Sequence, residues 1–375
     1  MMERRKNLND KFGFVDSMKI KDFIDYEQPN EYVVESDRYS SKYSTPVLTA
    51  GQSFILGYTN ESKGIYKKGP CIIFDDFTTS VHYVDFPFKV KSSAMKILTT
   101  KSNTDLKYCY YLLLSLSKMP PNHKRQWIST TSEKTHELPS MDKQIAIVKQ
   151  LDLISDTIAI YTKQIENFDN LVKARFIEMF GDPVSNSKHL PLKTLPQLGA
   201  FGRGVSKYRP RNAPELLNGP YPLIQTGDIA NSELYIKNYN NTYSEVGLKQ
   251  SKMWDKGTLC ITIAANIAKT AILQFDACFP DSVVGFNGNN LTNNIFVHYW
   301  FSFFQEILEN QAPESAQKNI NLKILSELQI ITPDIIEQNQ FADFVQQVDK
   351  SREAVKKSLE KTQQLYDSLM QEYFG

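Results

Sequence analysis

The chain repeats itself, and this repeat limits the possible architectures more than any single motif does. Residues 138–144 (LPSMDKQ) resemble residues 332–338 (TPDIIEQ), which lie 194 positions further along the chain. The same offset continues without a gap as far as the Phe-Gly pairs at 180–181 and 374–375. An ungapped match over about 40 residues, with a proline near each start and a glycine at each end, indicates an internal duplication.

Both copies show the periodicity of a long amphipathic helix. Apolar residues recur at spacings of three and four, and the second copy keeps the register with two polar interruptions, Arg352 and Thr362. Neither copy contains an internal proline or glycine, so about 40 residues can rise roughly 60 Å as one rod. The residues expected to pack between the two rods are Leu151, Ile154, Ile158, Ile165, Phe168, Val345, Val348, Val355, Leu359 and Tyr366.

A rod with a single apolar stripe needs a partner, and the other copy offers a complementary stripe. We therefore expect the two rods to pair with each other as an antiparallel coiled coil. The alternative is that each helix packs only on its own neighbouring domain.

The two stretches outside the rods are rich in short β-type runs and are distantly alike. Residues 46–51 (PVLTAG) resemble residues 222–227 (PLIQTG), and residues 69–74 (GPCIIF) resemble residues 257–262 (GTLCIT). The offset drifts between these matches, as expected when loops vary in length on a shared scaffold.

These patterns predict an α+β fold with a pseudo-two-fold internal repeat. Two mixed α/β domains, 1–138 and 183–331, are separated by two long antiparallel coiled-coil helices, 139–182 and 332–375.

Composition sets limits on partners and cofactors. Lys and Arg number 43 and Asp and Glu 42, so any basic surface must be local. The four cysteines form no close pairs and the five histidines show no zinc-binding spacing, so we predict buried thiols and no metal. No apolar run approaches the roughly 18 residues of a membrane span, which predicts a cytoplasmic protein.

No catalytic motif is recognisable in the sequence. Residues 64–69 have the glycine spacing of a phosphate-binding loop, but Pro70-Cys71 follows where Lys and Ser/Thr are needed. Residues 119–122 (MPPN) lack the residues that flank the prolines of an adenine methyltransferase motif, and Asp75-Asp76 lacks the Lys partner of a nuclease site. We therefore predict a non-catalytic chain that binds no cofactor itself.

The densest group of candidate binding residues lies in the segment 202–212 (GRGVSKYRPRN). It holds four cations and one aromatic residue without an acid, which suits phosphate neutralisation and bonds to base edges. A solvated basic loop is the alternative. The candidate DNA-binding residues here are Arg203, Lys207, Tyr208, Arg209, Arg211 and Asn212.

Three further polar segments support a surface that is used twice. Residues 38–43 (RYSSKY) precede the first PVLTAG strand, and residues 123–128 (HKRQWI) and 315–320 (SAQKNI) precede the two rods. The candidates in these segments are Tyr39, Lys42, Tyr43, Lys124, Arg125, Gln126, Gln317, Lys318 and Asn319.

In this order and duplication, the segments resemble the specificity (S) subunits of type I restriction-modification systems over essentially the whole chain. Residues 174–182 (ARFIEMFGD) look like the end of the family's central conserved helix, and Leu138-Pro139 with Gln144 looks like its beginning. Residues 45–51, 73–78 and 221–229 look like strands of its target-recognition domains.

The resemblance implies a role for each segment. Residues 1–138 and 183–331 would be target-recognition domains that read a split site on double-stranded DNA, and 139–182 and 332–375 would be the conserved helices. The partners would be two adenine-methylating modification subunits, which use S-adenosylmethionine, and restriction (nuclease and translocase) subunits, which use ATP and Mg²⁺. The alternatives are the specificity part of a different methyltransferase or nuclease assembly, and a coiled-coil scaffold that does not bind DNA.

Overall fold

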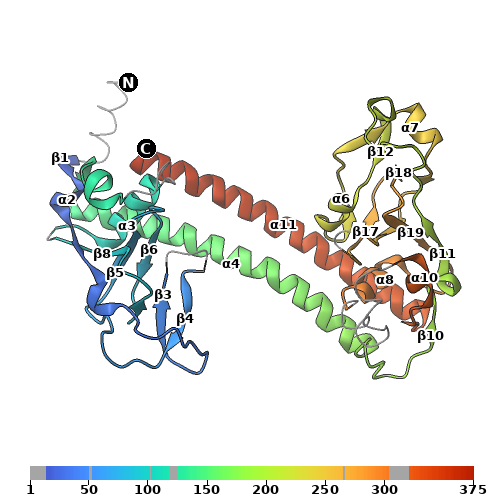
Figure 1. The fold of residues 1–375 in the computed structure, drawn as a ribbon, viewed down its shortest axis with the longest axis horizontal. Coiled ribbons are helices and arrows are strands. Elements are labelled where there is room, and N and C mark those ends of the chain that lie inside the picture. Colours follow the sequence, from blue (N-terminus) through green and yellow to red (C-terminus); the bar gives the residue numbers. More distant parts are fainter. Residues whose placement is uncertain (1–13, 50–52, 102, 118–124, 265–266, 304–320) are drawn as a thin grey trace. The chain divides into compact units, whose positions relative to one another are not determined.

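The computed structural model describes residues 14–49, 53–101, 103–117, 125–264, 267–303 and 321–375 (Figure 1). The chain divides into two compact units, of which the first comprises Met1–Thr162 with Lys357–Gly375 and the second Lys163–Lys356. Each unit therefore contains one globule and a part of both long helices, whereas the sequence predicted helices separate from the globules.

The first unit begins with a strand that pairs with the segment leading into the first long helix. Its elements are β1 (Phe14–Lys19), α2 (Ile20–Phe23), β2 (Ile24–Glu27), the 3-10 turn η1 (Pro29–Tyr32), β3 (Thr45–Leu48), β4 (Ile55–Thr59), β5 (Cys71–Asp75), β6 (Val81–Val84), β7 (Lys89–Val90), β8 (Met95–Thr100), α3 (Leu106–Leu116), the π-helical turn η2 (Trp127–Thr131), β9 (Thr135–Pro139) and the start of α4 (Met141–Phe180).

The second unit begins with the end of α4 and finishes within the second long helix. Its other elements are β10 (Leu192–Lys193), α5 (Leu195–Leu198), β11 (Gly199–Arg203), the 3-10 turn η3 (Pro214–Leu216), β12 (Leu217–Leu223), α6 (Thr226–Ala230), β13 (Tyr235–Ile236), β14 (Asn241–Tyr243), α7 (Glu245–Lys249), β15 (Met253–Trp254), β16 (Leu259–Thr262), β17 (Thr270–Leu273), β18 (Ala277–Cys278), β19 (Val283–Gly288), α8 (Asn294–Phe301), α10 (Leu322–Glu327), β20 (Ile330–Ile331) and the start of α11 (Ile335–Phe374).

The two globules share one topology, which confirms the predicted α+β repeat. The larger sheet has the order β2-β8-β5-β6 in the first unit and β11-β19-β16-β17-β13 in the second. The smaller sheet has the order β4-β3-β7 in the first unit and β14-β12-β18-β15 in the second. The segments matched by sequence fall on equivalent strands, β3 with β12 and β5 with β16.

Alternation along the central strand of each larger sheet explains this layering. Ile72 and Phe74 of β5 pack toward α3, whereas Cys71 and Ile73 pack toward the smaller sheet. In β16, Leu259 and Ile261 pack with α8, and Cys260 packs with the smaller sheet. Each globule thus buries both faces of its central strand, which explains the continuous apolar runs in the sequence.

The long helices α4 and α11 each contain 40 residues, and within each unit they run antiparallel. In the second unit, Asp169 pairs with Arg352 and the ring of Phe180 lies 5.6 Å from that of Phe341. In the first unit, the Tyr373 hydroxyl donates to Gln150 at 2.6 Å. Among the described residues, no helix combines the length and hydropathy that crossing a bilayer requires.

The predicted stripe is buried toward the ends of the helices and half-buried between them. Its members in the first unit join a cluster with Leu369, and those in the second unit join the large core around Phe176. The first group is Leu151, Ile154, Ile158 and Tyr366, and the second is Phe168, Val345 and Val348. Ile165, Val355 and Leu359 are half-buried and belong to none of the clusters of described residues.

A buried glutamine fixes the start of each long helix. The Oε1 atom of Gln144 accepts the backbone N–H of Asp105, which caps α3, and its Nε2 donates to the Pro139 carbonyl at 2.8 Å. The Oε1 atom of Gln338 accepts the N–H of Asn293, which caps α8, and its Nε2 donates to Pro333 at 2.9 Å. The duplication is therefore preserved at the level of single hydrogen bonds.

Candidate nucleic-acid interface

The basic segment 203–212 lies in the connection between β11 and β12, and a neighbouring segment holds it in place. The Oε1 atom of Gln250 accepts the backbone N–H groups of Lys207 at 2.7 Å and Tyr208 at 3.1 Å. The Ser251 hydroxyl donates to the Val205 carbonyl at 2.8 Å. These bonds tie the backbone of residues 205–208 to the neighbouring segment.

An acid from elsewhere in the chain lies among the arginines of this loop. The Arg211 Nη2 atom is 2.5 Å from Oδ1 of Asp281, and the Arg209 Nη2 atom is 3.8 Å from Oδ2. Arg203 Nε donates to the Asp281 backbone carbonyl at 2.8 Å. The segment itself contains no acid, but in three dimensions Asp281 partly neutralises its arginines.

The remaining candidates in this loop are exposed, and one of them already has a partner. The Tyr208 hydroxyl donates to Glu215 at 2.9 Å, and this hydrogen bond raises the pKa of Tyr208. Lys207 and Asn212 are exposed, and their side chains contact no described residue through a hydrogen bond or ion pair. All six candidates are thus exposed on the second unit, and Asp281 brings three of them, the arginines, together.

The counterpart in the first unit occupies the equivalent connection, between β2 and β3. The Tyr39 side chain is half-buried, and the ammonium group of Lys91 lies 5.9 Å from its ring centre. Lys91 forms an ion pair with Asp37, and their hydrogen bond lowers the pKa of Asp37. Arg38 and Lys42 are exposed and Tyr43 is half-buried, so this loop also offers cations together with two tyrosines.

The third predicted pair is only partly described. Lys124, Gln317, Lys318 and Asn319 lie outside the described residues. Arg125 is exposed, as a DNA contact requires.

Gln126 is 9% exposed and belongs to the protein interior, which does not fit its predicted contact with DNA. Its backbone N–H and that of Trp127 donate to Oδ1 of Asp76, whose Oδ2 lies 2.8 Å from Nζ of buried Lys96. Asp76 thus has a structural role, because it anchors the segment that leads to β9.

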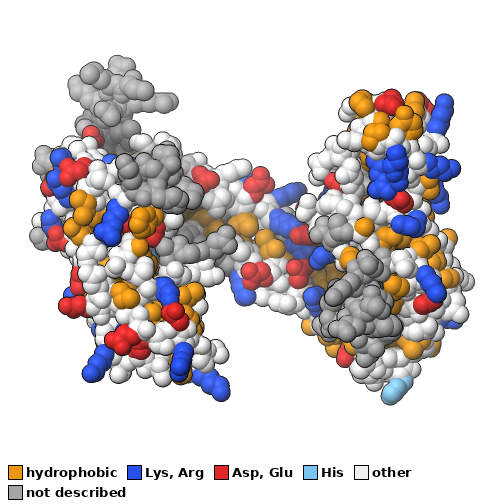
Figure 2. Space-filling model, in the orientation of Figure 1, with side chains coloured by type: hydrophobic (Ala, Val, Ile, Leu, Met, Phe, Trp, Pro, Cys, Tyr) orange, Lys and Arg blue, Asp and Glu red, His pale blue; other side chains and the backbone are white. Residues whose placement is uncertain are grey.

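Charge on the surface is mixed. Figure 2 shows Lys and Arg side chains interspersed with Asp and Glu on the visible face of each unit. The formal net charge is +1. Attraction to a polyanion therefore depends on local groups such as the β11–β12 loop.

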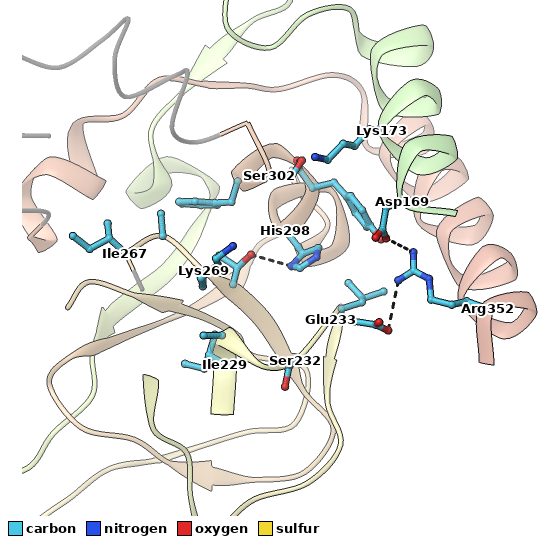
Figure 3. Close-up of a pocket in the computed structure, with 16 residues that line it drawn as sticks. Asp169, Lys173, Ile229, Ser232, Glu233, Ile267, Lys269, His298, Ser302 and Arg352 are labelled. Atoms are coloured by element: carbon cyan, nitrogen blue, oxygen red, sulfur yellow. Dashed lines mark hydrogen bonds and ion pairs between the residues drawn. The ribbon is translucent and has the colours of Figure 1, made fainter. Parts of the chain in front are cut away.

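A cavity of about 550 Å³ lies in the second unit between the long helices and the globule (Figure 3). Arg352 of α11, 4% exposed, contributes to its wall. The Nη2 atom lies 2.6 Å from Asp169 of α4, and Nη1 lies 3.6 Å from Glu233 of the globule. The polar interruption in the apolar stripe therefore joins α11 to both of its neighbours.

Known proteins with the same organisation identify the family. The family model described as "Type I restriction modification DNA specificity domain" matches residues 197–364. The chain is 32% identical over 369 residues to the type I restriction enzyme EcoR124I/EcoR124II specificity subunit of Escherichia coli, across 92% of this chain and 89% of that protein. The chain belongs to the type I restriction enzyme specificity subunits. This confirms the predicted family and its role as a non-catalytic, DNA-recognising subunit.

Solved structures share the fold of this specificity subunit. The S subunit from M. genitalium has a TM-score of 0.64 at 16% identity and covers 98% of each chain. A structure described as the basis of complex assembly and conformational transition of the type I R-M system has a TM-score of 0.54 at 14% identity, covering 94% of this chain and 97% of that one. At these identities the similarity establishes the shared fold.

Three carboxylates of the specificity subunit lie close together, and lysines of the same unit pair with two of them. Oxygen atoms of Glu233, Asp349 and Glu353 lie within 4.8 Å of one another. Lys356 Nζ is 2.6 Å from Glu233, and Lys237 Nζ is 2.8 Å from Glu353. Burial raises the pKa of Asp349, the member of the group without an ion pair within 4.0 Å among the described residues. We assign no metal to this group.

Sequence reasoning missed the residues that position the basic loop. Gln250 lies 43 residues from Lys207, and Asp281 lies 70 residues from Arg211. Neither stands in a recognisable motif, so only the pairing of β11 with β19 and the docking of residues 250–251 bring them to the loop.

Proposed function

We propose that this specificity subunit reads a bipartite DNA target, with one half-site contacted by each unit. The β2–β3 and β11–β12 loops occupy the same place in one shared topology, and this equivalence carries the proposal. Both loops present cations beside tyrosines. Lys and Arg suit phosphate contacts, and Arg also suits hydrogen bonds to base edges. A duplicated binding surface fits a target of two separated segments.

The proposed contacts differ between the two units in number. In the second unit they are Arg203, Lys207, Tyr208, Arg209, Arg211 and Asn212. In the first unit they are Tyr39, Lys42, Tyr43 and Arg125. Lys124 of the first unit, and Gln317, Lys318 and Asn319 of the second, remain predictions from sequence.

We further propose that the chain assembles with two adenine-methylating modification subunits and with restriction subunits in the cytoplasm of a bacterial or archaeal cell. S-adenosylmethionine, and ATP with Mg²⁺, would be bound by those partners. Membership of the family supports this composition. The near-neutral charge of the chain also supports it: the chain alone attracts DNA only weakly, so partner subunits would supply the remaining affinity for DNA.

Methylome sequencing of a host with and without this chain tests the bipartite target. We expect one adenine-methylated motif, split by an unspecified gap, that disappears when the chain is deleted. Exchange of residues 183–331 for the equivalent segment of another specificity subunit should change one half of the motif and leave the other. A single uninterrupted motif, or one that survives the deletion, would contradict the proposal.

Salt dependence separates DNA reading from a purely structural scaffold. A complex that contacts several phosphates loses roughly a thousandfold in affinity between about 50 and 200 mM salt. We expect the assembled complex to show this loss, measured by fluorescence anisotropy with labelled target DNA. A flat response would indicate a scaffold that does not bind DNA.

A further inference from the structure

We propose that Arg211 reads a guanine in the half-site of the second unit, and that Asp281 is the positioning residue that orients it. This inference rests on the proposed function, because it assigns one base contact within the β11–β12 loop. Arg203 and Arg209, the other arginines of the loop, make different hydrogen bonds and so have different roles.

Asp281 stands on a rigid turn. The Val283 N–H donates to the Pro280 carbonyl at 3.0 Å, and the Gly204 N–H donates to the Val283 carbonyl at 2.8 Å. A Cβ atom at Gly204 would lie 2.2 Å from the Phe279 carbonyl oxygen, so this close approach requires glycine. These contacts fix the backbone beside Asp281, and its carboxylate contacts Arg211 and Arg209.

Arg211 keeps most of its donors available. Its Nη2 bond to Asp281 is its one hydrogen bond to a described residue, and its side chain is 45% exposed. The remaining N–H groups of the guanidinium can form the two parallel bonds that match O6 and N7 of guanine. A carboxylate that holds one edge of the guanidinium lowers the entropy lost when the other edge binds a base.

Arg209 is used differently. Its Nη1 atom donates to the carbonyls of Ser206 at 2.6 Å and Tyr208 at 2.8 Å, both within the loop. These bonds close the loop on itself, so Arg209 shapes the backbone that carries Arg211. Lys207, by contrast, has no hydrogen bond or ion pair from its ammonium group to a described residue and is the cation best placed for a phosphate.

The charge of Asp281 favours a base over a phosphate at Arg211. A phosphate that approaches Arg211 also approaches the carboxylate 2.5 Å away, and the two negative charges repel. A guanine edge carries partial charges only, so it accepts from the guanidinium without that repulsion. The ion pair therefore selects against general backbone binding, which is a requirement for specificity.

The test uses the full chain assembled with its modification subunits, and it compares methylation rates on the target and on every single-base variant. Arg211→Lys keeps the charge and removes the planar fork. Asp281→Asn removes the charge with little change in shape, and Asp281→Glu retains the carboxylate. Lys207→Ala is the matched control in the same loop, and a thermal melt of each complex checks assembly.

We expect Arg211→Lys and Arg211→Ala to lose about 10- to 100-fold of the discrimination at one G·C pair and none elsewhere. Asp281→Asn should lower the discrimination at the same base pair by about 3- to 10-fold, and Asp281→Glu should lower it by less. In a protein that already carries Arg211→Ala, Asp281→Asn should cause no further loss of discrimination. Lys207→Ala should slow methylation of all sequences alike and reduce the slope of log affinity against log salt concentration by about 1.

Three results would overturn the inference. Equal losses on all sequences in Arg211→Ala would make Arg211 a phosphate contact, and relaxation of a different position in Asp281→Asn would make Asp281 an independent reader. Unchanged discrimination in both variants would show that neither residue contributes. A wild-type complex without any preferred sequence would instead refute the proposed function, so the two failures are distinguishable.

Discussion

Two glutamines at equivalent positions, Gln144 and Gln338, illustrate how single residues connect the long helices to the globules. Both are fully buried, and each satisfies a backbone N–H at the cap of a short helix and a proline carbonyl before a long one. A buried amide that makes these bonds stabilises modestly, but its removal leaves several polar groups without partners. The cost of substitution is therefore larger than the gain from the bonds.

Replacement of Gln338 by Leu should lower the free energy of unfolding by about 2 kcal/mol, since the Asn293 N–H and the Pro333 carbonyl lose their partner. Urea denaturation followed by circular dichroism measures this change. Gln340→Leu, at an exposed position of the same helix, is the control and should stay within about 0.5 kcal/mol. Equal effects of the two substitutions would show that the buried bonds contribute nothing.

Protonation of His298 should destabilise the second unit in mild acid. Burial lowers the pKa of His298 to about 4 from its ordinary value of 6.5, and its Nδ1 lies 2.9 Å from the Thr270 hydroxyl. Because the folded pKa lies below the unfolded one, the stabilisation is complete above pH 6.5 and is lost as the pH falls toward 4.

The urea concentration at the midpoint of unfolding should therefore decrease for the wild type as the pH falls from 6.5 to 4. It should decrease less for His298→Gln. His189→Asn, at an exposed histidine, should behave like the wild type. An identical decrease in wild type and His298→Gln would assign the pH dependence to carboxylates instead.

At the scale of elements, Arg352 shows how a long helix tolerates a charge in its apolar stripe. The same register position in the first copy is Ile158, which is half-buried with Tyr366. In the second copy, Asp169 of α4 and Glu233 of the globule surround the guanidinium. A buried charge with partners is tolerated, but it need not add stability compared with an apolar side chain of similar size.

Arg352→Met should therefore change the free energy of unfolding by less than about 1 kcal/mol, whereas Arg352→Asp should cost roughly 3 kcal/mol or more, because it places like charges together. Chemical denaturation of both variants gives these values. A large loss in Arg352→Met would show that the ion pairs stabilise the unit more than packing does.

The sequence predicted the elements better than it predicted the loop surface. The offset of 194 and the apolar periodicity correctly gave α4, α11 and the repeated strands, because these patterns are local. The neutralisation of Arg209 and Arg211 was not predictable, since Asp281 reaches them only through strand pairing. Gln126 was mistaken for a surface residue because its anchor, Asp76, lies 50 residues away.

At the scale of the whole molecule, α4 and α11 are continuous through both compact units, so their length should set the gap between the half-sites. Four residues inserted after Gln164, with four after Ser358 to keep the pairing, add roughly 6 Å of helix. Since base pairs are about 3.4 Å apart, the unspecified gap should grow by one or two base pairs. Methylome sequencing reads both the gap and the half-sites, and altered half-sites with an unaltered gap would contradict this role.

The four buried cysteines can report when each unit opens, because their alkylation can be followed over time. Cys71 and Cys109 belong to the first unit and Cys260 and Cys278 to the second, and burial raises the pKa of every one, that of Cys71 to about 12. Since only an exposed thiolate is alkylated, each cysteine reacts when its own unit opens. Mass spectrometry of alkylated peptides over time would thus measure the opening rate of each unit separately, both in the chain alone and with DNA or partners bound.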